Sequence, residues 1–172
     1  MTDVFVPDDM KLAKAKSFAQ STNAALEASR LCVAWLACGV AVGAYEAALK
    51  YALARKQFGK PIAKFQITQE KLSRMLAYCE LMISNLVHLS QRFDQGQATI
   101  GQIGRAKSIN TKLGREICQL AREICGGNGI ILDNHVMKQM MDMEAVHTYE
   151  GTYEVNSLVS GRELTGGLAA FK

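Results

Sequence analysis

The residue best suited to chemistry is Glu150, which stands in the stretch HTYEGTYEVNS beginning at His147. It lies between the aromatic ring of Tyr149 and Gly151, and a glycine lets a ligand come close to the backbone. A carboxylate placed there can act as a general base, and an apolar, ligand-filled surrounding would strengthen it in that role. A carboxylate just before a helix can also serve only to stabilise the helix dipole. These residues alone leave both interpretations open.

Two further stretches could contact a ligand. RKQFG supplies Arg55, Gln57 and Phe58, where a cation could bind a phosphate and a ring could stack on an aromatic base. CGGNG, residues 125–129, has three glycines, so that a phosphate or a flat ring could reach backbone N–H groups. It follows a predicted helix rather than a strand, which excludes the dinucleotide-binding βαβ unit. The structural alternatives are a solvated charge for the first stretch and a helix C-cap for the second.

Composition narrows the class of protein. The 172 residues suffice for one domain, and 49% hydrophobic with 21% charged residues is typical of a globular chain. The net charge of +4 is spread along the sequence, which argues against a nucleic-acid-binding face and would suit a small polyanionic ligand. Histidines and cysteines lack zinc-ligand spacing, so no metal site is expected. Free, buried thiols in a reducing compartment are predicted at Cys32, Cys38, Cys79, Cys118 and Cys125.

Helices dominate the predicted elements. Residues 22–55 lack proline and are rich in alanine and leucine. Their apolar middle is expected to be a buried helix and not a membrane span, because it contains small residues and is flanked by charges. Further helices are predicted over 66–93, 100–125 and 133–145, and a last one over 152–164 with Thr152 as its N-cap.

The spacing of apolar residues predicts how these helices pack. The helix over 66–93 carries a heptad-like stripe typical of antiparallel bundles, at Leu72, Met75, Cys79, Met82, Leu86, Leu89 and Phe93. The helix over 100–125 is expected to present one apolar side with Ile109, Leu113, Ile117, Leu120 and Ile124. A short strand is predicted at residues 4–6, before Pro7. The predicted fold is an all-α, up-down bundle of four main helices.

Three stretches occur in one order along the chain: YALARKQFGKPIAKFQITQEKL, AREICGGNGI and EAVHTYEGTYEVNSLVSGRELTG. Together they resemble the C-terminal helical domain of the acyl-CoA dehydrogenase and acyl-CoA oxidase superfamily. The resemblance is greatest to the glutaryl-CoA dehydrogenases and the plant-type short-chain peroxisomal acyl-CoA oxidases. It implies that residues 1–20 are the end of a middle β domain with a linker, and that residues 21–172 form the C-terminal bundle. Because the rest of the family's β domain and its N-terminal domain are missing from this sequence, we expect the isolated chain to be inactive.

The resemblance also implies a reaction. In this family the glutamate equivalent to Glu150 removes the proton α to the thioester carbonyl of an acyl-CoA, while FAD accepts the β hydride, and a trans-2-enoyl-CoA results. Glutaryl-CoA is one candidate substrate. Two alternatives stay open: an acyl-CoA oxidase that passes electrons to oxygen, and a helical oligomerisation module without catalytic activity.

Site residues are implied position by position. The acyl-CoA site is expected to include Leu26, Glu27, Arg30, Tyr149 and Gly151. Contacts to FAD, some across a subunit interface, are expected from Arg55, Gln57, Phe58, Gln66, Glu123, Ile124, Cys125, Gly126, Gly127, Thr152, Glu154 and Phe171.

The resemblance further implies partners. A tetramer built as a dimer of dimers is expected, with electron-transfer flavoprotein as the acceptor if the protein is a dehydrogenase. No binding of nucleic acid is expected. The ending AAFK is no peroxisomal SKL-type signal, so mitochondrial matrix, peroxisome and bacterial cytoplasm all stay open.

Overall fold

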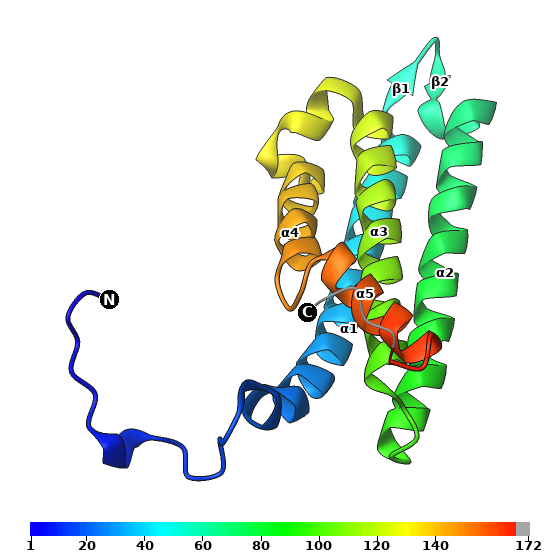
Figure 1. Ribbon diagram of the computed structural model, residues 1–172. Helices are drawn as coiled ribbons and strands as arrows, with labels where there is room; N and C mark the ends of the chain where they lie inside the picture. Colours follow the sequence, from blue (N-terminus) through cyan, green and yellow to red (C-terminus); the bar gives the residue numbers. More distant parts are fainter. Residues whose placement is uncertain (168–172) are drawn as a thin grey trace.

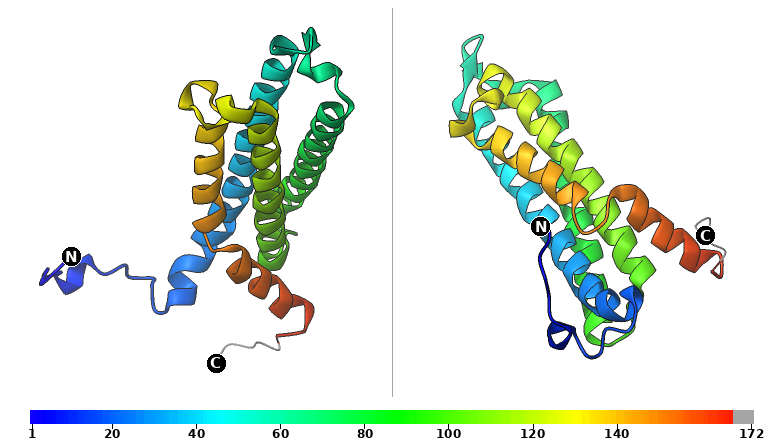
Figure 2. Two further views of the ribbon diagram at one scale, coloured as in Figure 1. Left: turned by 90° about the horizontal axis from the view of Figure 1, so that it is seen from above. Right: turned by 60° about the vertical axis from the view of Figure 1, so that its left-hand side comes forward.

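The computed structural model describes residues 1–167, and of residues 18–20, 23 and 24 it describes the backbone alone. Four helices lie alongside one another and a fifth, shorter one crosses the third (Figures 1 and 2). They are α1 (Phe18–Ala54), α2 (Gln66–Asp94), α3 (Ile100–Cys125), α4 (Val136–Thr148) and α5 (Tyr153–Leu164). The expected all-α bundle is confirmed.

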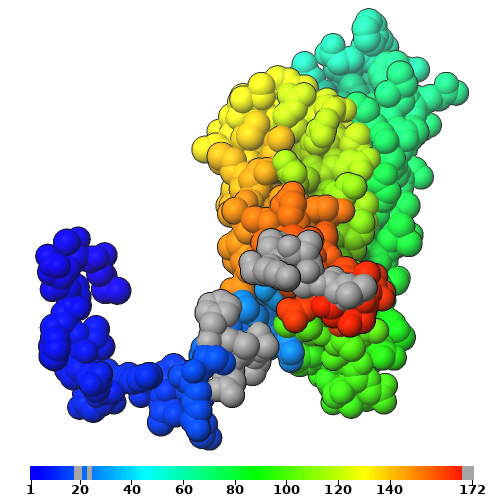
Figure 3. All heavy atoms as spheres, in the orientation of Figure 1, coloured from blue at the N-terminus to red at the C-terminus, as the bar shows by residue number. Residues whose placement is uncertain are grey.

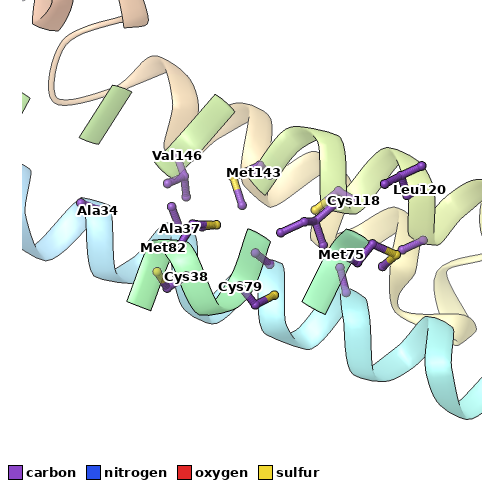
Figure 4. Close-up of a cluster of buried hydrophobic side chains, with 14 of the residues drawn as sticks. Ala34, Ala37, Cys38, Met75, Cys79, Met82, Cys118, Leu120, Met143 and Val146 are labelled. Carbon is purple, nitrogen blue, oxygen red and sulfur yellow. The ribbon is translucent and has the colours of Figure 1, made fainter. Parts of the chain in front are cut away.

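Small and sulfur-containing side chains fill the core between the helices (Figure 4). On α1 alanines recur every three or four residues, and because they are small they let neighbouring helices approach closely; those with no exposed surface are Ala34, Ala37, Ala41, Ala44, Ala48 and Ala52. The predicted stripe on α2 is buried from Leu72 to Leu89. By length and composition residues 25–54 could cross a membrane, but core helices meet the same criterion, and half of the apolar window is buried in the bundle.

The third helix is the centre of the fold, since α1, α2, α4 and α5 all pack against it. It begins with a capping box, in which Thr99 and Gln102 bond to each other's backbone N–H groups. Of the expected apolar side of this helix, Ile117, Leu120 and Ile124 are buried, whereas Leu113 is half-buried and Ile109 is 42% exposed. Two polar residues of the same helix, Lys107 and Thr111, are fully buried instead.

Two loop regions differ from the sequence-based expectation. Residues 4–6 form no strand, and the first described element is a 3₁₀ turn, η1 (Asp8–Met10), in a segment that extends away from the bundle (Figures 1 and 3). A strand needs a partner for its backbone groups, and none lies beside this segment in the described part of the chain. The helix expected over 133–145 begins three residues later, after η3 (Gly126–Ile130) and η4 (Leu132–Asn134).

A small hairpin joins α1 to α2. Strands β1 (Lys56–Gln57) and β2 (Lys60–Pro61) pair in antiparallel fashion, and η2 (Ile62–Lys64) leads into α2. The turn residues Phe58 and Gly59 have φ angles of +52° and +78°. Positive φ at both central positions is the requirement of a two-residue hairpin turn whose twist matches that of the strands. The hairpin therefore presents Phe58, 91% exposed, at its tip.

Candidate active site

Glu150 occupies a constrained turn between α4 and α5. Its φ angle is +56°, in the left-handed region that few non-glycine residues adopt, and Gly151 follows with φ +87°. Thr152 then caps α5, and its hydroxyl accepts a hydrogen bond from the N–H of Val155. A strained backbone of this kind persists only where the surrounding contacts hold it, and such strain is concentrated at functional sites.

Two residues of α1 hold Glu150 from one side. The hydroxyl of Ser29 donates a hydrogen bond to Oε2 of Glu150 at 2.7 Å. Nε of Arg30 donates to the backbone carbonyl of Glu150 at 3.3 Å, and Arg30 is only 6% exposed. One carboxylate oxygen is thereby fixed, while the other, Oε1, has no hydrogen-bond donor among the described residues. The half-buried carboxylate is positioned to accept a proton at Oε1.

On the other side Lys107 of α3 holds the backbone of the turn. Its ammonium group donates to the carbonyl of His147 at 2.9 Å and to that of Gly151 at 2.6 Å. The side chain has no exposed surface. Burial, followed by the nearby charge of Arg30, lowers the pKa of Lys107 to about 8, while the carboxylate of Glu150 acts in the opposite direction.

Asn156 of α5 completes the enclosure of the turn. Its Nδ2 donates to the carbonyls of Gly151 at 2.8 Å, Thr152 at 3.1 Å and Glu150 at 3.3 Å, and the side chain is fully buried. Behind it, Nδ1 of His147 lies 2.9 Å from the hydroxyl of Thr111. Burial lowers the pKa of His147 most, and the nearby charges of Arg115 and Lys107 lower it further. The imidazole therefore favours its neutral form.

A second group of predicted residues lies elsewhere, at the end of the bundle that carries the hairpin (Figure 1). Arg55, Gln57, Phe58 and Gln66 are all exposed there. The glycine loop η3 lies at the same end, where Asn128 Nδ2 donates to the hydroxyl of Tyr51 at 2.8 Å. The 13 residues of α4 separate this loop from the Glu150 turn, about 20 Å of helix. One chain therefore does not bring the two groups together.

Residues 18–165 match the family model for the C-terminal domain of acyl-CoA dehydrogenase. The chain belongs to the acyl-CoA dehydrogenase family. Its curated relatives include the caffeyl-CoA reductase–Etf complex subunit CarC of Acetobacterium woodii, 33% identical over 159 residues, which are 92% of this chain and 42% of that protein.

Two solved structures of glutaryl-CoA dehydrogenase from Mycobacterium smegmatis are similar to this domain. One has a TM-score of 0.91 at 35% identity, over 97% of this chain and 43% of that chain. The other, in complex with FADH2, has a TM-score of 0.81 at 33% identity, over 86% of this chain and 38% of that chain. The acyl-CoA dehydrogenase domain described here thus spans less than half the length of these relatives.

Within this acyl-CoA dehydrogenase domain three of the expected acyl-CoA residues, Arg30, Tyr149 and Gly151, lie at the Glu150 turn. Leu26 and Glu27 are half-buried on α1, one turn before Arg30, and Tyr149 is 41% exposed beside the catalytic candidate. Nε of Arg30 donates its hydrogen bond to the backbone of Glu150, so part of the role of Arg30 is to hold this residue.

The expected FAD residues are more dispersed. Thr152 and the exposed Glu154 begin α5, and hydrogen bonds from the backbone of Glu154 and from Thr152 lower the pKa of Glu154. The carboxylate of Glu123 binds Lys71 at 2.7 Å, which lowers the pKa of Glu123 and leaves that side chain engaged. Ile124 and Cys125 are buried beside it, and Phe171 lies outside the described residues. The contacts expected from these positions stay predictions.

Three residues that hold the Glu150 turn have no recognisable motif in the sequence: Lys107, Asn156 and Ser29. The available signal was a break in the pattern of α3, where Lys107 and Thr111 share a face with apolar neighbours such as Ile103 and Gly114. Polar residues on an otherwise buried face indicate hydrogen-bond partners inside the fold, but not which ones. No group of three metal-binding side chains occurs in the part of the chain that the structure describes.

The three glycines of GGNGI have different roles. Gly126 has φ +56°, and it ends α3. A Cβ on Gly129 would lie 2.5 Å from the carbonyl oxygen of Arg122, so this position requires a glycine for packing. Gly127 has neither constraint, since a Cβ there would meet nothing within 4 Å. Gly127 is therefore the residue of this loop best placed for contact with a ligand.

Because of this difference, we expect alanine at the two positions to change the free energy of unfolding by very different amounts. Gly129→Ala should lower the free energy of unfolding by about 2–3 kcal/mol, because backbone atoms of α3 cannot move aside as a flexible side chain would. Gly127→Ala should change it by less than about 0.5 kcal/mol. Urea unfolding of both variants checks this, and equal losses would contradict the assignment of the two glycines.

The lowered pKa of Lys107 leads us to expect that the stability of the domain depends on pH. Its pKa is about 8 in the folded chain and 10.5 as the ordinary value, so between these pH values the unfolded chain alone carries the proton. The free energy of unfolding must then rise with pH in that window. We expect the stability difference between wild type and Lys107→Met to shift in favour of wild type by about 2–3 kcal/mol from pH 7 to pH 10. A difference that stays constant in urea titrations at both pH values would contradict this.

Proposed function

We propose that the complete protein is an FAD-dependent oxidoreductase of acyl-CoA thioesters, in which Glu150 exchanges the proton on the carbon α to the thioester carbonyl. The observation that carries this proposal is the fixed carboxylate: Glu150 sits at φ +56°, and Ser29 engages one of its oxygens at 2.7 Å. A base held in one geometry needs no reorganisation at the moment of proton transfer. Family membership supports the same chemistry.

The residues of the hairpin end fit a dinucleotide such as FAD. The guanidinium of Arg55 is exposed and has no ion-pair partner among the described residues, so it is available to a diphosphate. The ring of Phe58 contacts Phe65 edge to face but is 91% exposed, so it is available to stack on an aromatic base. Gly127 leaves backbone open in the loop at the same end of the bundle. FAD bound in the complete protein would supply the acceptor for the β hydride.

The residues near Glu150 carry the proton chemistry. The α C–H bond breaks, and the proton goes to Oε1 of Glu150, while Ser29 stays bonded to Oε2 and fixes the orientation of the carboxylate. Gly151 is needed for the shape of the turn, because its φ is +87° and a Cβ there would lie 2.9 Å from Nδ2 of the buried Asn156. In the opposite direction the same Glu150 returns the proton to the α carbon of an enoyl thioester.

Both directions have named relatives, a glutaryl-CoA dehydrogenase and a caffeyl-CoA reductase. We propose the dehydrogenase direction, with a short acyl-CoA such as glutaryl-CoA as substrate and a trans-2-enoyl-CoA as product. The likeness to glutaryl-CoA dehydrogenase over 97% of the chain supports this choice. We further propose a homotetramer built as a dimer of dimers, in which the hairpin end of one subunit would meet the Glu150 turn of another, since about 20 Å of helix separates the two within one subunit. Electron-transfer flavoprotein is the proposed acceptor.

The test is anaerobic mixing of the full-length holoprotein with butyryl-CoA or glutaryl-CoA. Loss of the visible flavin band supports the proposal. The matched control is the butyl thioether of CoA, which lacks the carbonyl that acidifies the α proton and should leave the band unchanged. A bound flavin that neither acyl-CoA bleaches, and that the corresponding enoyl-CoA does not reoxidise after chemical reduction, would overturn it.

A further inference from the structure

Lys107 is a buried cation that does not belong to the reacting groups. It has the largest side chain among those fully buried in the described part of the chain. An ammonium group inside a protein is costly unless its hydrogens are all used, and Lys107 uses two of its three on backbone carbonyls. A leucine or methionine would fill the same space at lower cost. The presence of a lysine here therefore needs a reason other than packing.

The reason lies in which carbonyls it binds. His147 is in the last turn of α4, where the helix leaves carbonyl groups without partners, and Gly151 is the last residue before the cap of α5. Hydrogen bonds of 2.9 Å and 2.6 Å from one nitrogen thus tie together the two ends of segment 147–151. Glu150 lies inside this segment, at its most constrained φ angle.

The two hydrogen bonds of Lys107 to the carbonyls of His147 and Gly151 form a bridge across the segment. The ammonium group of Lys107 also interacts electrostatically with the carboxylate of Glu150. The charged and titratable groups around it are Arg30 from α1, His147 from α4 and Glu150 from the turn. Thr111, one helical turn along α3, donates to the carbonyl of Lys107 at 3.0 Å and contacts His147 at 2.9 Å. The segment is therefore held at both ends by α3 and at its centre by α1.

We propose that Lys107 is a positioning residue of this active site, whose two hydrogen bonds to the ends of segment 147–151 hold Glu150 in reach of the substrate's α carbon. This inference rests on the proposed function of Glu150. Misplacing a catalytic group by about 1 Å can cost about 100-fold in rate. Without the two hydrogen bonds of Lys107, α3 no longer ties the two ends of the segment together, although Arg30 and Asn156 still contact it. A lysine that served only the fold would change the amount of folded protein but not the rate per folded molecule.

The experiment uses the full-length flavin-loaded protein and three variants: Lys107→Met, Lys50→Met and Glu150→Gln. Lys50 is an exposed lysine on α1 and serves as the matched control. Flavin reduction by saturating acyl-CoA is measured per bound flavin, so that unfolded protein does not count. We expect Lys107→Met to lower this rate by about 100-fold with KM changed less than about threefold, and Lys50→Met to match wild type.

Amide hydrogen exchange provides a readout that does not depend on catalysis. Lys107→Met should raise exchange of residues 148–152 at least about tenfold relative to the core of α3, whereas Lys50→Met should not. If Lys107→Met yields no folded protein, Lys107→Ala with added propylammonium replaces it, and activity that returns with propylammonium but not with propanol supports the bridge.

Each outcome decides one proposal. Wild-type rates and unchanged exchange in Lys107→Met overturn the bridge, as does equal rescue of Lys107→Ala by both additives. Retained flavin reduction in Glu150→Gln overturns the proposed function instead. In that case the exchange measurement alone decides whether Lys107 holds the segment.

Discussion

Full-length protein with Glu150→Gln will bind flavin normally but will reduce it about 1,000- to 10,000-fold more slowly with acyl-CoA. Glutamine keeps the shape of glutamate, and its carbonyl oxygen can still accept the hydrogen bond from Ser29. What it lacks is a site that can take up a proton from carbon. Stopped-flow measurement of the visible flavin band under anaerobic conditions gives the rate directly.

The matched control for this change is Glu46→Gln, which neutralises an exposed carboxylate on α1 far from the turn. Its rate should equal that of wild type, since a surface charge does not reach the reacting atoms. A second comparison is Ser29→Ala, which keeps Glu150 but releases Oε2 and should lower the rate far less. If Glu150→Gln reduces flavin as fast as wild type, another group removes the proton and the assignment of the base is wrong.

Glu150 could be found from the sequence because its signal is local. A carboxylate followed by glycine at the start of a helix is visible in four residues, and so is the N-cap at Thr152. The helices are predictable for the same reason, since each depends on a run of neighbouring residues. For the third helix the predicted range, 100–125, equals the observed one, Ile100–Cys125. Such features need no knowledge of the fold.

The residues that hold Glu150 could not be found in that way. Ser29 lies 121 positions from Glu150 in the sequence. Lys107 lies 40 positions from His147 and 44 from Gly151. Only the packing of α1 and α3 against the turn brings these residues together. The hairpin was missed for a related reason: its two-residue strands are too short to show alternation, and its turn places Phe58 at positive φ where asparagine or glycine is usual.

The second large effect is expected at Asn156. Replacement with aspartate keeps the size of the side chain but removes the amide that donates to three carbonyl oxygens. Oδ1 of Asn156 is already buried without a partner among the described residues, and the second carboxylate oxygen would meet the carbonyl oxygens that Nδ2 now contacts. We expect Asn156→Asp to lower the free energy of unfolding by about 3–5 kcal/mol at pH 7, measured by urea unfolding.

The pH dependence of this loss identifies its cause. Burial beside carbonyl oxygens must raise the pKa of the new aspartate in the folded state above its unfolded value, so the folded chain binds more protons in that window and loses stability as pH rises. At pH 4 the protonated carboxyl can donate one hydrogen bond, and the loss should shrink. Asn85→Asp, on the exposed side of α2, should cost less than about 0.5 kcal/mol at either pH. A loss at position 156 that is the same at pH 4 and pH 7 would mean that shape, and not the missing donor, decides how this turn is held.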